Sequence, residues 1–274
     1  MLRVRAVTGI ILVSVFAFSL LFDNARFFPL LLLIGTGCAV YEWSKLSGVP
    51  AKKWSYIVST SVVIFLILFW TLFRNSLFST IVVIAWINAI FWCTIVINLF
   101  VAPSRIWMLQ SPLTALVIGL TLLVSVSTGL AWLAHQIRGV ELLVILIGII
   151  ALADSGAYFA GKWFGKHKLA PLVSPGKTIE GMIGGLVLSL CIVLAVGTGL
   201  DIDLHRYMSL IIVTCLVALF SVVGDLFESS AKRVANVKDS GNILPGHGGV
   251  LDRMDGVIAA TPVFVLFQHY YPLA

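Results

Sequence analysis

The run Ile57-Val-Ser-Thr-Ser-Val-Val-Ile-Phe-Leu-Ile-Leu-Phe-Trp70 carries no charged side chain, and it decides the class of the protein. Similar apolar runs recur along the 274 residues, of which 60% are hydrophobic and only 11% are charged. The mean hydropathy is +1.07. A soluble domain carries about 25% charged residues. The composition therefore excludes soluble, disordered and disulfide-stapled chains, and it indicates a polytopic integral membrane protein.

The apolar runs predict an all-α fold, because a membrane-spanning helix needs about 20 mostly apolar residues. We expect about nine transmembrane helices on this rule, at residues 6–22, 27–41, 55–73, 77–100, 112–134, 141–161, 181–199, 207–225 and 251–271. The first two flank Asp23-Asn-Ala-Arg26 closely, which favours a tight hairpin. The N-terminus resembles a signal peptide, but no A-x-A cleavage site precedes Asp23, so we expect an uncleaved first span.

Lysine and arginine predict the orientation of these spans. With a cytoplasmic N-terminus, the opposite side of the membrane receives only four of the 18 basic residues: Arg26, Arg74, Arg138 and Arg206. Because cytoplasmic loops are enriched in Lys and Arg, we expect the N-terminus inside and the C-terminus outside. The short outer loops favour a bacterial cytoplasmic (inner) membrane. In such a protein the net charge of +6 reflects the excess of Lys and Arg in the cytoplasmic segments. We therefore expect no nucleic-acid partner.

Several acids lie where the membrane should begin or end. Asp154 falls within the predicted span 141–161, where burying a carboxylate costs at least ~2.5 kcal/mol unless it faces a polar cavity or a cation. A hydrogen bond between helices, aided by Ser155 and Gly156, is the alternative interpretation. The last span is long enough only if its helix extends back to Leu251. Asp252 and Asp255 would then share one face of that helix.

A second acidic pair, Asp225 and Glu228, is predicted to end the preceding span. Two pairs of carboxylates would thus flank one cytoplasmic loop. Oxygen ligands of this kind suit Mg²⁺, alone or with a second cation, together with substrate phosphates. The alternative is an electrostatic network of these acids with Lys232, Arg233 and Lys238.

The same loop carries groups suited to phosphate. Pro245-Gly-His-Gly-Gly249 precedes the last helix, so unhindered backbone N–H groups, including those of Gly248 and Gly249, could meet an anion. The nearby cations Lys232, Arg233, Lys238 and Arg253 suit phosphate oxygens. His247 is either an acid–base group or a turn residue. A second candidate phosphate clamp, Ser174-Pro-Gly-Lys-Thr-Ile-Glu-Gly181, offers Ser174, Lys177 and Thr178, although it is not a Walker A loop.

Residues 229–255, hereafter the signature segment, resemble the signature of phosphatidate cytidylyltransferases, or CDP-diacylglycerol synthases. The segment reads Ser-Ser-Ala-Lys-Arg-Val-Ala-Asn-Val-Lys-Asp-Ser-Gly-Asn-Ile-Leu-Pro-Gly-His-Gly-Gly-Val-Leu-Asp-Arg-Met-Asp. Residues 174–181 and Asp154-Ser-Gly-Ala-Tyr158 are similar to two further motifs of the family. Ala231 departs from the larger apolar residue usual there. The motifs cover the C-terminal half, and the N-terminal half matches only in general character.

The resemblance implies that CTP and phosphatidic acid react to give CDP-diacylglycerol and pyrophosphate. It also implies dependence on Mg²⁺, a cytoplasm-facing polar cavity and a homodimer. Carried over residue by residue, it makes Asp225 and Asp252 metal ligands with Asp255 close by, and it places Ser174 and Lys177 at the substrate phosphates. We accordingly divide the chain into N-terminal helices at 1–140, about five in number by the span rule, and a catalytic region at 141–274.

Two other functions fit parts of this pattern. A CTP-dependent polyprenol kinase would release CDP in place of pyrophosphate, and the signature segment argues against it. A proton-coupled secondary transporter would also have many spans and intramembrane acids. Transporter sites usually lie near the bilayer midplane between repeats. Here the polar residues gather toward one membrane face and no repeat is visible, which disfavours a transporter.

Overall fold

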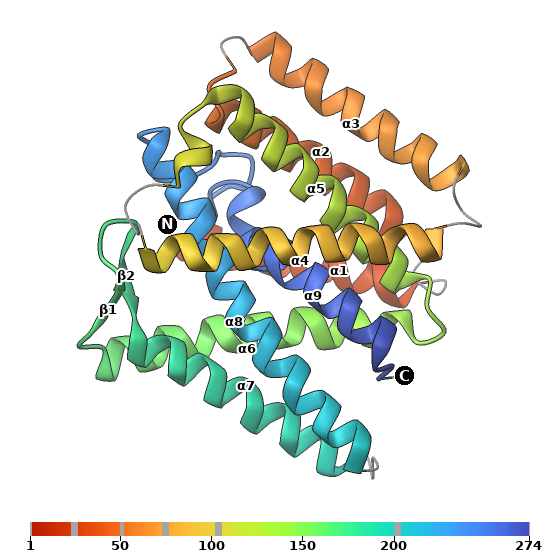
Figure 1. The fold of residues 1–274 in the computed structure, drawn as a ribbon, viewed down its shortest axis with the longest axis vertical. Helices are drawn as coiled ribbons and strands as arrows, with labels where there is room; N and C mark the ends of the chain where they lie inside the picture. The colour runs from red at the N-terminus through yellow and green to blue at the C-terminus, as the bar shows by residue number, and fades with distance from the viewer. Residues whose placement is uncertain are drawn as a thin grey trace. The chain divides into compact units, whose positions relative to one another are not determined.

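The computed structural model describes residues 2–22, 27–49, 52–72, 77–101, 106–199 and 204–273. The predicted hairpin at 23–26, with its Arg26, lies outside these residues, as do Arg74 and Arg105. Within them the chain is almost entirely helical (Figure 1). The α-helices are α1 (Leu2–Leu21), α2 (Phe28–Leu46), α3 (Lys52–Leu72), α4 (Leu77–Val101), α5 (Pro112–Ala134), α6 (Gly139–Phe164), α7 (Ile179–Gly199), α8 (Leu204–Val234) and α9 (Asp255–Tyr270).

Short elements complete the described fold. Two 3₁₀ turns, η1 (Trp107–Leu109) and η2 (Leu251–Arg253), precede α5 and α9. Two strands, β1 (Lys168–Ala170) and β2 (Ser174–Thr178), form an antiparallel hairpin between α6 and α7. The all-α prediction therefore holds for the class, but it missed this hairpin.

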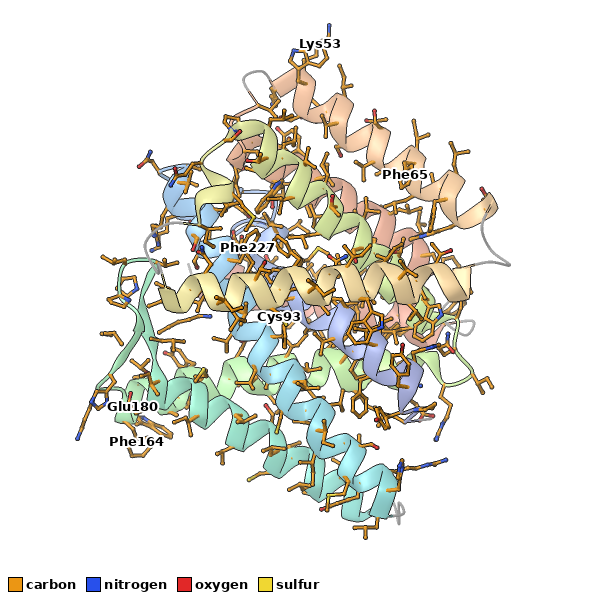
Figure 2. The ribbon with its side chains drawn as sticks, viewed as in Figure 1. Lys53, Phe65, Cys93, Phe164, Glu180 and Phe227 are labelled. Carbon is orange, nitrogen blue, oxygen red and sulfur yellow. The ribbon has the colours of Figure 1, made fainter. Side chains whose placement is uncertain are left out.

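Six of the helices in the described ranges, α3 to α8, are long and apolar enough to cross a membrane. Large apolar side chains on α3, Phe65 among them (Figure 2), are exposed, as suits contact with lipid. The integral-membrane prediction is thus confirmed, whereas the count of nine spans is not. Helix α9 has 16 residues and is about 24 Å long, less than the ~30 Å of a hydrocarbon core.

Two predicted helix boundaries were wrong. Helix α8 does not end at Asp225 but continues to Val234, so Asp225 and Glu228 lie inside it. The last helix does not extend back to Leu251, because η2 ends at Arg253 and α9 begins only at Asp255. Asp252 and Asp255 therefore belong to different elements and do not share the face of one α-helix.

The described chain forms two compact units, each built from separate stretches. The first contains Met1–Val83, Trp107–Val140 and Ala231–Met254. In it α2 packs between α3 and α5, where Nε1 of Trp43 donates to the carbonyl of Ala115 at 2.8 Å. A Cβ on Gly119 would lie only 1.7 Å from the same nitrogen, so the glycine makes room for the indole. Residues Ala231–Met254 of the signature segment thus belong to the same unit as the first three helices.

The second unit contains Ile84–Ile106, Glu141–Ser230 and Asp255–Ala274. In it α6 and α7 lie side by side (Figure 1), with glycines at the points of closest approach. A Cβ on Gly156 would lie 2.8 Å from the carbonyl oxygen of Gly184, and one on Gly185 would lie 2.3 Å from that of Ala153. Small residues allow helices in a membrane to approach this closely. This seam positions the hairpin that connects the two helices.

Candidate functional site

The signature segment begins near the C-terminal end of α8. A backbone hydrogen-bond motif ends the helix there. Asn236 has a φ of 56°, and the N–H of Val237 donates to the carbonyl of Lys232 at 2.9 Å. The N–H of Asn236 donates to the carbonyl of Arg233 at 3.1 Å. These two bonds form a Schellman motif, in which asparagine is a common left-handed residue. The motif turns the chain from the helix into the loop that follows.

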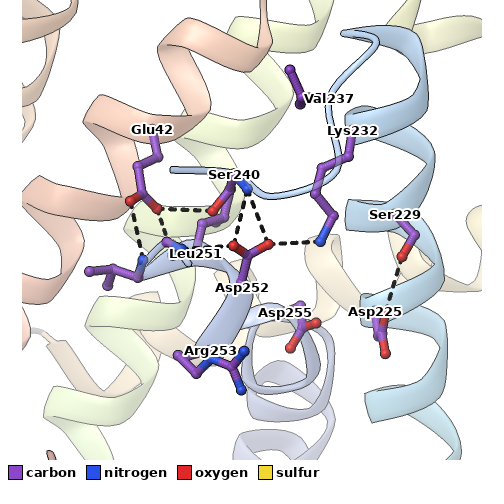
Figure 3. Close-up of polar contacts among 12 residues, drawn as sticks. Glu42, Asp225, Ser229, Lys232, Val237, Ser240, Leu251, Asp252, Arg253 and Asp255 are labelled. Atoms are coloured by element: carbon purple, nitrogen blue, oxygen red, sulfur yellow. Dashed lines mark hydrogen bonds and ion pairs between the residues drawn. The ribbon is translucent and has the colours of Figure 1, made fainter. Parts of the chain in front are cut away.

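Asp252 is surrounded by donors of the signature segment itself (Figure 3). Its Oδ1 accepts a hydrogen bond from Nζ of Lys232 at 2.7 Å. Its Oδ2 accepts from the backbone N–H of Ser240 at 3.0 Å and of Gly249 at 2.8 Å. Both charged side chains are largely buried, with exposures of 11% for Lys232 and 8% for Asp252. This is the network with Lys232 that was one of the two interpretations of the acids, and it holds the loop closed on itself.

The predicted phosphate-binding glycines have unequal roles. Gly248 has a φ of 82°, a conformation that favours glycine. Gly249 is buried, and its N–H already donates to Asp252. His247 lies half-buried between them and Pro245, and its carbonyl accepts from Nη2 of Arg253 at 3.2 Å.

The remaining cations of the loop lie toward solvent. Arg233 and Lys238 are exposed, and Nη1 of Arg233 donates to the carbonyl of Val237 at 3.2 Å. Arg253 is also exposed. Exposed cations of this kind suit phosphate oxygens.

In the second unit, Lys177 and Asp225 form an ion pair at 2.6 Å between Nζ and Oδ2. Lys177 lies on β2 and Asp225 on α8, so the hairpin brings a cation to the acid of the helix. The other oxygen of Asp225, Oδ1, accepts from Oγ of Ser229 at 3.2 Å (Figure 3). Both side chains of the ion pair remain partly exposed, at 24% and 32%.

Asp255 lies in the same unit and interacts electrostatically with Asp225, Asp154 and Lys177. Close packing of α8 against α9 explains why it lies near Asp225. A Cβ on Gly224 would lie 2.2 Å from the carbonyl oxygen of Asp255, so only glycine allows this approach. Oδ1 of Asp255 accepts from the N–H of Gly256 at 2.8 Å. The structure thus brings Asp225, Asp154 and Lys177 within electrostatic range of Asp255.

The hairpin holds the other residues of the second predicted clamp. Ser174 begins β2 and is half-buried. Thr178 instead caps α7, because its Oγ1 accepts from the N–H of Gly181 at 3.1 Å. Glu180, which lies near Phe164 at the end of α6 (Figure 2), accepts from Nδ1 of His167 at 2.6 Å and from the N–H of Lys166 at 3.1 Å. These contacts fix the base of the hairpin.

The predicted site residues thus form two sets, one in each unit. The first unit contains Asp252, Lys232, His247, Gly248, Gly249 and Arg253. The second unit contains Lys177, Asp225, Asp255, Asp154 and Ser174. Among the described residues, no three His, Cys, Asp or Glu side chains gather closely enough to hold a metal by themselves. Sequence reasoning missed Glu42, which contacts the signature segment at Ser240 and Leu251.

Comparisons with known proteins agree with the motifs. A model of the cytidylyltransferase family matches residues 3–271. A phosphatidate cytidylyltransferase of Haemophilus influenzae is 32% identical over 98% of this chain and 99% of its own length. One of Pseudomonas aeruginosa is 34% identical over 96% of both chains. One of Staphylococcus aureus is 48% identical over 46% of this chain and 48% of its own.

Proposed function

Because this chain belongs to the cytidylyltransferase family, we propose that it transfers the cytidylyl group of CTP to phosphatidic acid in the membrane. The products would be CDP-diacylglycerol, a precursor for phospholipid synthesis, and pyrophosphate. The observation that carries this proposal is the similarity to phosphatidate cytidylyltransferases over 96% or more of both chains.

The charges of the substrates define what the protein must do. The phosphate of phosphatidic acid is already an anionic nucleophile, so the reaction needs no strong general base. Its oxygen attacks the α-phosphorus of CTP, and the bond to the pyrophosphate oxygen breaks. The obstacle is the repulsion between two polyanions, so cationic and hydrogen-bonding groups must hold them together.

Lys177 is suited to this task. An ammonium group has three N–H donors, and the ion pair with Asp225 uses one of them. The remaining donors can bind a phosphate oxygen while Asp225 keeps the side chain in place. Ser174, at the start of the same strand, would add a hydroxyl donor.

A divalent cation fits the acids beside Lys177. Mg²⁺ commonly takes one or two protein carboxylates and completes its shell with substrate phosphates and water. Asp225 and Asp255 would supply such a pair, and the nearby charge of Asp154 also favours a cation. A bound Mg²⁺ would neutralise the phosphates and stabilise the departing pyrophosphate. Asp252 stays a predicted ligand; protein donors contact both of its oxygens, as they do both oxygens of Asp225.

The exposed cations of the signature segment suit the triphosphate. Arg233, Lys238 and Arg253 lie on its surface, and Gly248 leaves the backbone unhindered. We propose that this segment binds CTP from the cytoplasm while the acyl chains of phosphatidic acid remain in lipid. This arrangement agrees with a polar cavity that opens to the cytoplasm, with the N-terminus inside and the C-terminus outside, as we propose. We also propose that the protein is a homodimer in the bacterial inner membrane.

The test is product formation by the purified protein in detergent micelles with CTP, Mg²⁺ and phosphatidic acid. We expect CDP-diacylglycerol and pyrophosphate in equal amounts. Diacylglycerol, which lacks the phosphate nucleophile, should give no product. Equal turnover with diacylglycerol, or release of CDP, would overturn the proposal.

A further inference from the structure

Glu42 is a buried acid that the proposed chemistry does not use. It lies one turn before the end of α2, and only 1% of its surface is exposed. A buried carboxylate is costly unless hydrogen bonds compensate for the lost water. Its partners should therefore reveal its role.

Within the described ranges, the hydrogen-bond partners of Glu42 belong to the signature segment (Figure 3). Oε1 accepts from the N–H of Val250 at 3.2 Å, and Oε2 accepts from the N–H of Leu251 at 2.9 Å. Oε2 also accepts from Oγ of Ser240 at 3.1 Å. Val250 and Leu251 begin the 3₁₀ turn η2, where backbone N–H groups lack partners within the helix. Glu42 thus caps η2 from a helix about 200 residues earlier in the chain.

The loop backbone is shaped to receive this carboxylate. A Cβ on Gly241 would lie 2.2 Å from Oε1 of Glu42, and one on Gly249 would lie 2.5 Å from Oε2. Neither distance is possible for a real side chain, so both positions require glycine while Glu42 is in place. This gives Gly249 a reason for its identity that is separate from phosphate binding.

Glu42 and Asp252 hold the same loop from two sides. Ser240 gives its hydroxyl to Glu42 and its N–H to Asp252. Leu251, bound by Glu42, is the immediate neighbour of Asp252, which in turn holds Lys232. A shift of the Glu42 carboxylate would therefore move the turn that carries Asp252 and release Ser240.

We propose that Glu42 is a positioning residue, which fixes residues 240–252 in the conformation that binds CTP. It contacts no substrate itself and acts through the backbone of the loop. The role in binding CTP rests on the proposed function, but the role as an anchor rests only on the contacts of the first unit.

Glu42→Gln tests the anchor with little change in size. The amide offers only one acceptor oxygen. Its NH₂ group must then face a donor of the loop that bonds the carboxylate in the wild type, so that hydrogen bond is lost. Thr36→Val is the matched control, because Thr36 lies on the same helix, is equally buried at 1% and bonds Ser127 of α5 instead of the loop. Hydrogen exchange of residues 240–252 and steady-state kinetics are measured for both variants and the wild type in one detergent.

In Glu42→Gln we expect exchange of residues 240–252 to be faster by about tenfold or more, because the bonds to a charged acceptor are lost. We expect kcat/KM for CTP to fall by about tenfold or more, with KM for phosphatidic acid less affected. Thr36→Val should change neither the exchange of the loop nor the ratio of the two KM values.

Wild-type exchange of residues 240–252 in Glu42→Gln would overturn the anchor, whatever happens to activity. A wild-type protein without cytidylyl transfer would instead overturn the proposed function, while the exchange result would still decide the anchor. If Glu42→Gln does not fold, Ser240→Ala takes its place, because it removes one of the three bonds and leaves both backbone bonds. It should loosen the loop in the same direction by a smaller factor, and unchanged exchange there would contradict the anchor.

Discussion

Nζ of Lys177 lies 2.6 Å from Oδ2 of Asp225, so the lysine expected to bind phosphate is held by an acid expected to bind metal. The ion pair joins the β-hairpin to α8 within one unit. It orients the ammonium group before substrate arrives, which reduces the ordering that binding would otherwise require.

Replacing Lys177 should impair the reaction more than the assembly of the protein. We expect Lys177→Ala to lower kcat/KM by about a hundredfold, because a charge that stabilises the transferring phosphate is lost. Lys177→Arg keeps the charge but changes donor geometry and bulk, so it should be clearly impaired but better than alanine. Lys166→Ala and Lys168→Ala are controls at exposed positions and should lose little. Normal turnover by Lys177→Ala with an inactive Lys168→Ala would place the clamp elsewhere in the loop.

Removing either acid beside Lys177 should weaken metal binding. Asp225→Asn and Asp255→Asn keep the size of the side chain but remove the charge that attracts Mg²⁺. We expect near-complete loss of turnover at low Mg²⁺ and partial recovery at high Mg²⁺. Glu141→Gln, at the exposed beginning of α6, should titrate with Mg²⁺ like the wild type. A wild-type Mg²⁺ dependence in both variants would remove these acids from the metal site.

Asp252→Asn separates the two roles considered for this acid. The change weakens the ion pair with the buried ammonium of Lys232, so the free energy of unfolding should fall by about 3 kcal/mol. Turnover should be nearly lost, and a shared-metal role predicts that the loss deepens at limiting Mg²⁺. Thermal unfolding in detergent and a titration of activity with Mg²⁺ measure the two effects. Wild-type activity at limiting Mg²⁺ would contradict a metal role for Asp252.

Gly224→Ala should disturb the site without touching a charged group. The added Cβ would lie 2.2 Å from the carbonyl oxygen of Asp255, so α9 must move away from α8. We expect lower thermal stability and a loss of activity that added Mg²⁺ does not restore. Gly148→Ala is the matched control on α6, because a Cβ there meets nothing within 4 Å. Its helix should be stabilised by about 1 kcal/mol, and equal effects of the two changes would contradict the packing argument.

The orientation of the chain can be read from cysteine labelling. In a background without the native cysteines, Val237→Cys should react only with reagents that reach the cytoplasm. Tyr271→Cys, after α9, should react from outside, because the predicted topology crosses the membrane an odd number of times. Cytoplasmic labelling at both positions would mean that α9, which lies between them, does not cross.

The sequence predicted the long helices well because a span needs only length and hydrophobicity. The predicted span 112–134 coincides with α5. The prediction failed at the end of α8, because the charged residues after Asp225 favour a loop, whereas the helix continues for two more turns. Asn236, which ends α8 in a left-handed conformation, was the available signal.

Contacts between distant segments account for what the sequence could not reveal. Glu42 follows the predicted span 27–41 and reads as an ordinary acid at a membrane boundary. Its partners begin at Ser240, and no local pattern joins them. Likewise, the acidic pairs were recognised as unusual, but the ion pair of Lys177 with Asp225 depends on the hairpin, which was not predicted.

The fate of the CTP phosphates tests the central claim most directly. The purified protein is incubated with phosphatidic acid and Mg²⁺ in two parallel reactions, one with CTP labelled at the α-phosphate and one with CTP labelled at the γ-phosphate. Cytidylyl transfer predicts that the α label enters the lipid fraction and that the γ label leaves as pyrophosphate. Appearance of the γ label in lipid, with CDP released, would contradict the account and indicate a kinase.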